Sequence, residues 1–344
     1  MKVFLYSLFI GLLGYVVTLL QPVVPLADDA SVEETLVALG AEPAPHQVDT
    51  SIMGTSVEQG ASLFHTGFAE GPDGKKQPKQ SANFVCTSCH NNQREDPDLR
   101  YADPEARLDY VVDNDMPFLQ ATTLYGAVNR RSFYNGDYQK KYGDLVFKAR
   151  NDLREAIQLC ATECAQGREL TDWELESVLA YLWTLELRIS DLQLPAEDRT
   201  FIEQALAGKA DQAEAVAKIK SRYLDYSPAT FVKPPKDRKE GYTEVEGRPE
   251  RGKLIYEHSC LHCHENARYA FFRLDDSENT FEYLTRHIDR YTRYSIYQVG
   301  RYGTSPMPGK RTYMPNYTAE KMSNQQMEDL RAYIEQEAAG GKEN

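Results

Sequence analysis

Apolar residues recur at intervals of three and four along two distant segments, 170–182 (LTDWELESVLAYL) and 322–334 (MSNQQMEDLRAYI). This spacing places them on one face of a helix, so each segment is predicted to form an amphipathic helix. The two segments align without a gap, and the second residue of each begins a capping box, T-x-x-E in one and S-x-x-Q in the other. The same closing helix is therefore predicted twice.

A second pair of helices is predicted ahead of these, at 58–64 (EQGASLF) and 250–256 (ERGKLIY), and each segment has a central glycine and a final aromatic residue. A CxxCH motif follows each of them. Three motifs that recur in the same order indicate two related helical units, predicted at 56–190 and 250–340. No long strand-like segment occurs, so the predicted class is all-α.

The other segments connect or precede these units. Residues 191–249 begin as a charged helical stretch and continue as an extended one with several prolines, which predicts a partly helical linker. Residues 28–55 are predicted to be a loosely ordered lead-in. Within 1–27, Lys2 precedes an uncharged apolar run at 3–20, which is typical of an export signal, either a cleaved signal peptide or a retained membrane anchor. Both place the rest of the chain outside the cytoplasm, in the periplasm or an equivalent compartment.

Length and charge narrow the classes of partner. The chain has 344 residues, which favours two domains, and a net charge of −13. So acidic a chain is not suited to nucleic acid or to an anionic membrane surface. We therefore expect its partner to be a neutral or basic protein.

Four of the six cysteines stand in the motifs CTSCH (86–90) and CLHCH (260–264). Two thiols one turn apart reach the two vinyl groups of one porphyrin, and the histidine that follows, His90 or His264, binds the iron. A zinc site made of two CxxC pairs needs them roughly 15–20 residues apart, and a thioredoxin-like pair needs no histidine. Each motif therefore predicts one covalently bound haem c. The predicted attachment residues are Cys86, Cys89, Cys260 and Cys263.

This order of motifs resembles the class I cytochrome c family, in which a methionine ligand precedes the closing helix. The resemblance covers roughly 56–188 and 250–338, and it implies two tandem all-α haem domains that transfer electrons. In the second unit Met314, followed by proline, lies nine residues before the cap of the closing helix and is the expected sixth ligand of the iron. Met307, also followed by proline, is the alternative.

The first unit has no methionine in the corresponding loop. Instead, Cys160 and Cys164 flank the position nine residues before the cap. A thiolate ligand from one of them is predicted, which lowers the reduction potential of that haem. A local disulfide is the alternative, with strain expected because side chains four residues apart on a helix are poorly directed for one. Met116 also precedes a proline, but it lies 55 residues before the cap, which favours a core or loop role.

The stretches LYGAVNRR (124–131) and LREAIQLCATECAQGREL (153–170) are similar to the first domain of the thiosulfate dehydrogenases and of the related haem subunit of the bacterial sulfur-oxidation complex. In that family a cysteine three residues after an isoleucine binds the catalytic iron. Ile157 and Cys160 match this pattern, so the resemblance favours Cys160 over Cys164 as the iron ligand.

The chain departs from that family at three positions near the cysteine, where arginine, serine and methionine are replaced by Ala156, Cys164 and Ala165. In the family, the arginine and the serine help to hold an anionic sulfur substrate. Other arginines remain as sources of positive charge or as partners of haem propionates, namely Arg130, Arg131, Arg150 and Arg154.

The predicted function is single-electron transfer between two haems and on to a protein partner, such as another cytochrome or a respiratory or photosynthetic complex. The alternative is an enzyme that oxidises a small sulfur anion, such as thiosulfate, at the first haem, with Cys160 as the catalytic residue.

Overall fold

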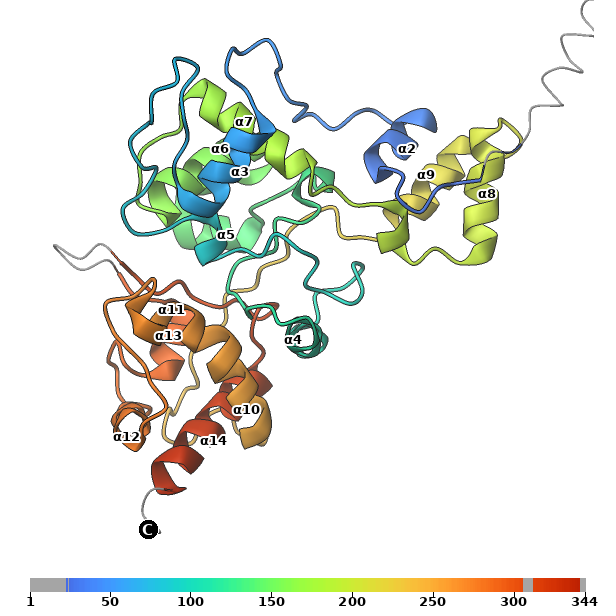
Figure 1. The fold of residues 1–344 in the computed structure, drawn as a ribbon. Coiled ribbons are helices and arrows are strands. Elements are labelled where there is room, and N and C mark those ends of the chain that lie inside the picture. The colour runs from blue at the N-terminus through green and yellow to red at the C-terminus, as the bar shows by residue number, and fades with distance from the viewer. Residues whose placement is uncertain (1–22, 24, 306–311, 341–344) are drawn as a thin grey trace, which may run out of the picture. The chain divides into compact units, whose positions relative to one another are not determined.

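The computed structural model describes residues 23, 25–305 and 312–340. These residues form helices and loops with a few isolated β-bridges and no strand, which confirms the predicted all-α class. They divide into a small unit, 1–43 with 187–223, and a large unit, 44–186 with 224–344 (Figure 1). Within the described residues no helix is long and apolar enough to cross a membrane, and the apolar run at 3–20 lies outside them.

The small unit combines part of the predicted lead-in with the last residues of the predicted first unit, 187–190, and with part of the predicted linker. It contains α2 (Val32–Ala38), α8 (Ala196–Leu206) and α9 (Gln212–Lys220). The backbones of the two segments pair, because Val32 donates to the carbonyl of Leu187 at 3.1 Å and Ile189 donates to that of Ala30 at 3.0 Å. The side chains of Leu36, Ile202 and Ile219 are buried in this unit.

In the large unit, α3 (Val57–Thr66) packs on α7 (Asp172–Trp183), which begins at the predicted capping box. The helices touch at Gly60, where an added Cβ would lie 1.9 Å from the carbonyl oxygen of Ser177. Next to this contact, the rings of Phe64 and Tyr181 lie 5.0 Å apart. Glycine is therefore required at this position for the two backbones to approach.

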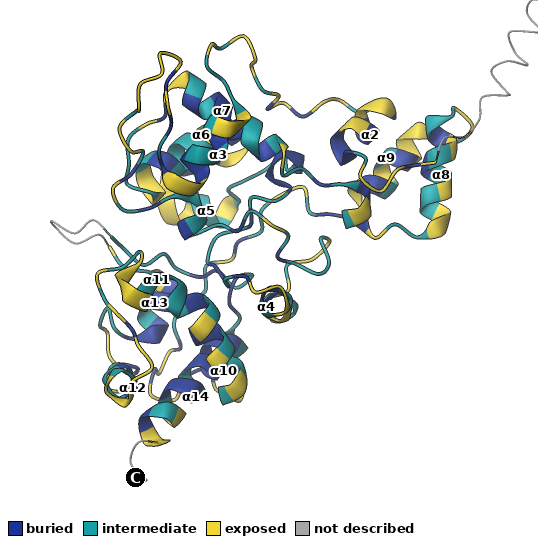
Figure 2. Ribbon diagram, in the orientation of Figure 1, coloured by how far each residue is buried: buried dark blue, intermediate teal, exposed yellow. Residues whose placement is uncertain are grey.

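A second helix pair, α10 (Pro249–Ile255) and α14 (Asn324–Gly340), has the same contact. A Cβ added at Gly252 would lie 1.9 Å from the carbonyl oxygen of Asp329, and the rings of Tyr256 and Tyr333 lie 5.6 Å apart. The capping box predicted at the start of this closing helix is present. Much of α14 is buried (Figure 2).

Helix α4 (Pro104–Asp113) lies within the predicted first unit in sequence but packs with the second helix pair. Leu108 and Val111 belong to the same hydrophobic core as Tyr256 and Met327. Met116, which follows this helix, is buried in that core, as its sequence position favoured. The remaining helices of the large unit are α5 (Gly136–Tyr142), α6 (Leu153–Leu159), α11 (Leu261–His264), α12 (Glu278–Thr285) and α13 (Ile296–Tyr302).

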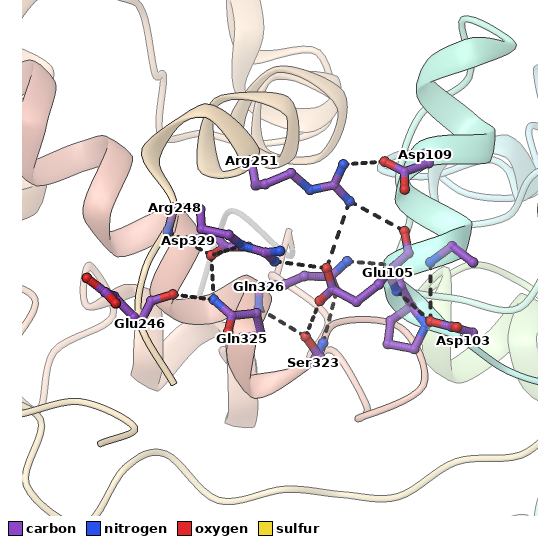
Figure 3. Close-up of polar contacts among 12 residues, drawn as sticks. Asp103, Glu105, Asp109, Glu246, Arg248, Arg251, Ser323, Gln325, Gln326 and Asp329 are labelled. Atoms are coloured by element: carbon purple, nitrogen blue, oxygen red, sulfur yellow. Dashed lines mark hydrogen bonds and ion pairs between the residues drawn. The ribbon is translucent and has the colours of Figure 1, made fainter. Parts of the chain in front are cut away.

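Polar contacts also hold α4 to the second helix pair (Figure 3). Glu105 accepts a hydrogen bond of 2.7 Å from Ser323 and one of 3.0 Å from Arg248. Arg248 in turn donates to Asp329 on α14 at 2.7 Å. Helix α4 is therefore fixed to the second pair through both its apolar face and its charged end.

A buried ionic cluster also links the two predicted units. Glu95 and Arg107 are fully buried and lie 3.2 Å apart, and Lys321 donates to the other oxygen of Glu95 at 2.7 Å. Burial raises the pKa of Glu95, but the charges of Arg107 and Lys321 lower it by more, so the pKa lies below its usual value. Glu95 is therefore a carboxylate neutralised by two cations, one of them from near the end of the chain.

Candidate functional site

The first CxxCH motif places its histidine against a backbone carbonyl. A short 3₁₀ turn spans Cys86–Ser88, and Nδ1 of His90 lies 2.6 Å from the carbonyl oxygen of Thr122. A carbonyl only accepts, so Nδ1 carries the proton and Nε2 keeps a lone pair for a metal. Burial lowers the pKa of His90, which keeps the imidazole neutral.

The second motif reproduces this arrangement. The turn Tyr256–Cys260 is π-helical and leads into α11, and Nδ1 of His264 lies 2.5 Å from the carbonyl oxygen of Phe272. Burial lowers the pKa of His264 as well. Both motif histidines are therefore oriented by a carbonyl and left with a free Nε2, which is the arrangement that an axial iron ligand needs.

A cavity of about 270 Å³ opens beside the first motif, and Cys86, Cys89 and His90 line it. Its apolar wall comes from the first helix pair and α6, namely Leu63, Phe64, Ile157, Val178 and Leu182. This wall and the free imidazole nitrogen suit a large apolar ring with a metal at its centre.

Cys160 and Cys164 lie on the wall of the same cavity, in a π-helical turn that follows α6. Both are free thiols, so the alternative of a local disulfide is not observed. A hydrogen bond to Cys160 and burial raise the pKa of Cys164 well above its usual value. Cys164 has exposed surface because it borders the cavity. The protein around the cavity nevertheless removes much of the water from around the thiol.

Two cations line the first cavity. Arg130 donates to the carbonyls of Thr123 at 2.9 Å and Tyr125 at 3.2 Å, and burial lowers its pKa to about 10. Lys321 is the second cation. Arg154, another candidate from the sequence, is engaged elsewhere because it pairs with Glu176 at 2.5 Å.

The second motif opens onto two smaller cavities, of about 80 and 70 Å³. Both are lined by Cys260, His264 and Met314, so the structure brings the predicted histidine and methionine ligands together. Two hydrogen bonds fix the methionine backbone, since Met314 donates to Oγ1 of Thr304 at 2.8 Å and Thr304 donates to its carbonyl at 2.9 Å. Met307, the alternative ligand, lies outside the described residues.

The two sites share part of their walls. Five residues line both the first cavity and the larger of the second pair, namely Phe84, Cys89, Gln120, Tyr313 and Pro315. The motifs also meet directly, because the imidazole of His262 lies against the backbone of Thr87 and Ser88. Groups attached to the two motifs therefore lie next to each other.

Sequence reasoning missed most of the far wall of the first cavity. That wall is aromatic and comes from three separate segments, as Tyr134, Tyr138, Tyr142, Phe231 and Tyr313. The tyrosines at 134, 138 and 142 follow a helical spacing of four, which is a local signal for a shared face. No local signal marks Phe231 or Tyr313, because they reach the site only through the tertiary fold.

The described residues contain no cluster of three or more His, Cys, Asp and Glu side chains arranged to hold a metal ion. A haem iron needs no such cluster, because the porphyrin supplies four of its ligands and the protein supplies one or two. The histidine, thiol and methionine groups described above suit that donor set.

Comparison with known proteins identifies the second half of the large unit. The family model for cytochrome c oxidase, cbb3-type, subunit III matches residues 247–334, which include α10, the CLHCH motif and Met314. No curated protein and no solved structure matches the chain. Domains of this class bind haem c covalently and transfer electrons to protein partners. Residues 247–334 therefore form a c-type cytochrome domain.

Proposed function

We propose that the chain is an exported diheme c-type cytochrome that transfers single electrons between two covalently bound haems and on to a protein partner. The observation that carries this proposal is the equivalence of the two motifs. His90 and His264 each donate from Nδ1 to a carbonyl and each leave Nε2 at a cavity beside a CxxC pair. The first motif has the same donor geometry as the one inside the c-type cytochrome domain.

The groups available as sixth ligands make the two sites unequal. We propose Cys160 for the first haem, with Cys164, which lines the same cavity, as the alternative. Met314 serves the second haem, with Met307 as the alternative. A thiolate donates charge to iron and lowers its potential, whereas a thioether raises it, so electrons flow from the first haem to the second.

The chain's own residues bring the two attachment sites together. Cys89 belongs to the first motif and also lines a cavity of the second, so haems attached at the two motifs would be neighbours. Arg130 would supply positive charge to a haem propionate at the first site, whereas Lys321 is already paired with Glu95. When bound, the haems supply the redox chemistry, and the protein sets their potentials and excludes water.

Export and anchoring are part of the same proposal. The apolar run at 3–20 follows Lys2 and acts as a signal peptide or as an anchor in the inner membrane, which places the haem sites in the periplasm. There, the partner is another cytochrome or a respiratory or photosynthetic complex. The net charge of −13 favours a neutral or basic docking surface on that partner.

A spectroelectrochemical titration of the purified protein tests this proposal. We expect two one-electron transitions at different potentials, and the lower one should belong to the haem attached at Cys86 and Cys89. A single transition would contradict the two-haem proposal.

Oxidation of a sulfur anion at the first haem is the second candidate. The observation that favours it is that two thiols and the guanidinium of Arg130 line one cavity. Mixing the oxidised protein with thiosulfate distinguishes the candidates. Rapid haem reduction supports the enzyme, and no reduction by thiosulfate supports the carrier.

A further inference from the structure

The segment 312–318 forms part of the wall of both sites. Met314 lines the second site, whereas its neighbours Tyr313 and Pro315 line the first site as well as the second. Further along, Asn316 and Thr318 line the first site. The residue expected to bind the second iron is thus flanked on both sides by residues that form the first site.

Contacts at each end hold this segment in place. On the second site, the two hydrogen bonds between Met314 and Thr304 fix the backbone. A Cβ added at Gly303 would lie 2.6 Å from the carbonyl oxygen of Met314, so the backbone at Gly303 is in close contact with the backbone at Met314. On the first site, Lys141 of α5 donates to Oδ1 of Asn316 at 2.8 Å.

Tyr313 makes the most direct contact between the sites. Its ring meets Phe84 edge to face, with centroids 5.7 Å apart, and both rings line both cavities. Cys160 and Cys164 line the first cavity together with Tyr313, so the ring and the two thiols border the same site.

We propose that the segment 312–318 couples the two haem sites, so that the bond between Met314 and the second iron holds Tyr313 in the wall of the first site. This inference rests on the proposed function. Packed protein interiors move as units rather than deform smoothly, so a shift of Met314 displaces its neighbour. A change of ligand at the second haem then alters the surroundings of the first haem and the access of small molecules to it.

Substitution of Tyr313 tests whether its ring affects the haem at the first site. Tyr313→Ala should change the electron paramagnetic resonance (EPR) g-values of the first haem in the oxidised protein. Tyr313→Phe keeps the ring and should behave as the wild type. The proposed role of the ring would be overturned if the alanine variant behaved as the wild type, or if the phenylalanine variant behaved as the alanine variant.

Substitution of Met314 tests the coupling. Met314→His keeps a ligand at the second iron but changes its reach, and we expect the first-haem EPR signal to change along with that of the second. Met327→Leu is the matched control, because Met327 also lines the second site but lies on α14 rather than on the segment. It should leave the first-haem signal unchanged.

The haem content separates this inference from the proposed function. Two haems per chain with an unchanged first-haem signal in Met314→His would overturn the coupling alone. One haem per chain in the wild type would overturn both.

Discussion

Lys321 donates a hydrogen bond of 2.7 Å to Glu95, although 226 residues separate them in the sequence. Glu95 lies just after the first CxxCH motif, and Lys321 lies just before the closing helix of the second. The same carboxylate is paired with Arg107. This buried cluster ties the segment after the first motif to the c-type cytochrome domain.

We predict that Glu95→Gln destabilises the large unit by about 3–5 kcal/mol, because it leaves two buried cations without their partner. Denaturant unfolding at neutral pH measures this change. Asp137→Asn is the control, since its ion pair with Lys140 is exposed and its loss should cost less than about 1 kcal/mol. Equal effects of the two variants would show that the buried cluster does not stabilise the fold.

The same cluster predicts a pH dependence. The pKa of Glu95 is lower in the folded protein than its usual value of 4.5, so the unfolded chain binds a proton more readily. The stability from this group is therefore complete above pH 4.5 and is lost as the pH falls towards the folded pKa. Unfolding free energies at several acidic pH values should decline more steeply for the wild type than for Glu95→Gln. Parallel curves would contradict this assignment.

The local chemistry of the site was predictable because it resides in short motifs. The capping box at Ser323 and the two CxxCH motifs follow from spacing within about one or two helical turns, whereas the choice of Met314 as the partner of His264 follows from the resemblance to the class I cytochrome c family. No local motif predicts the contact of Lys321 with Glu95, because the sequence around each residue does not specify its partner. The same holds for α4, whose apolar face predicts burial but not the core it joins.

The sequence also did not predict that the lead-in pairs with residues 187–190, at the end of the predicted first unit. Val32 and Leu187 meet through backbone atoms, and a backbone hydrogen bond does not depend on the identity of the side chain. Each segment alone looked weakly ordered because each supplies only part of a core. Their helices become a compact unit only when Leu36, Ile202 and Ile219 are buried together.

The glycines at the helix crossings give a paired prediction. Gly60→Ala and Gly252→Ala should each destabilise the large unit by about 1–3 kcal/mol, because each added Cβ would meet a carbonyl oxygen on the facing helix. Thermal unfolding of the two variants measures this cost. Gly136→Ala is the control, since nothing lies within 4 Å of its added Cβ, and it should be neutral. A tolerated alanine at either crossing would contradict the close approach.

We predict that substitutions of the two thiols of the first site give different spectra. Cys160→Ala should abolish the thiolate signature of the first haem in low-temperature EPR and raise its potential, because the charge donated by the thiolate is lost. Cys164→Ala should keep the signature with shifted g-values, since it removes only the hydrogen-bonded neighbour. The reverse pattern would assign the ligand to Cys164. If neither variant changed the signal of the first haem, ligation by either thiol would be excluded.

If the first motif binds a haem as the second does, the haem content measured against protein mass will show it. We expect two covalently bound haems per chain in the wild type and one in a Cys86→Ser, Cys89→Ser variant, with the haem at Cys260 and Cys263 retained. One haem in the wild type, or no loss in the variant, would contradict it.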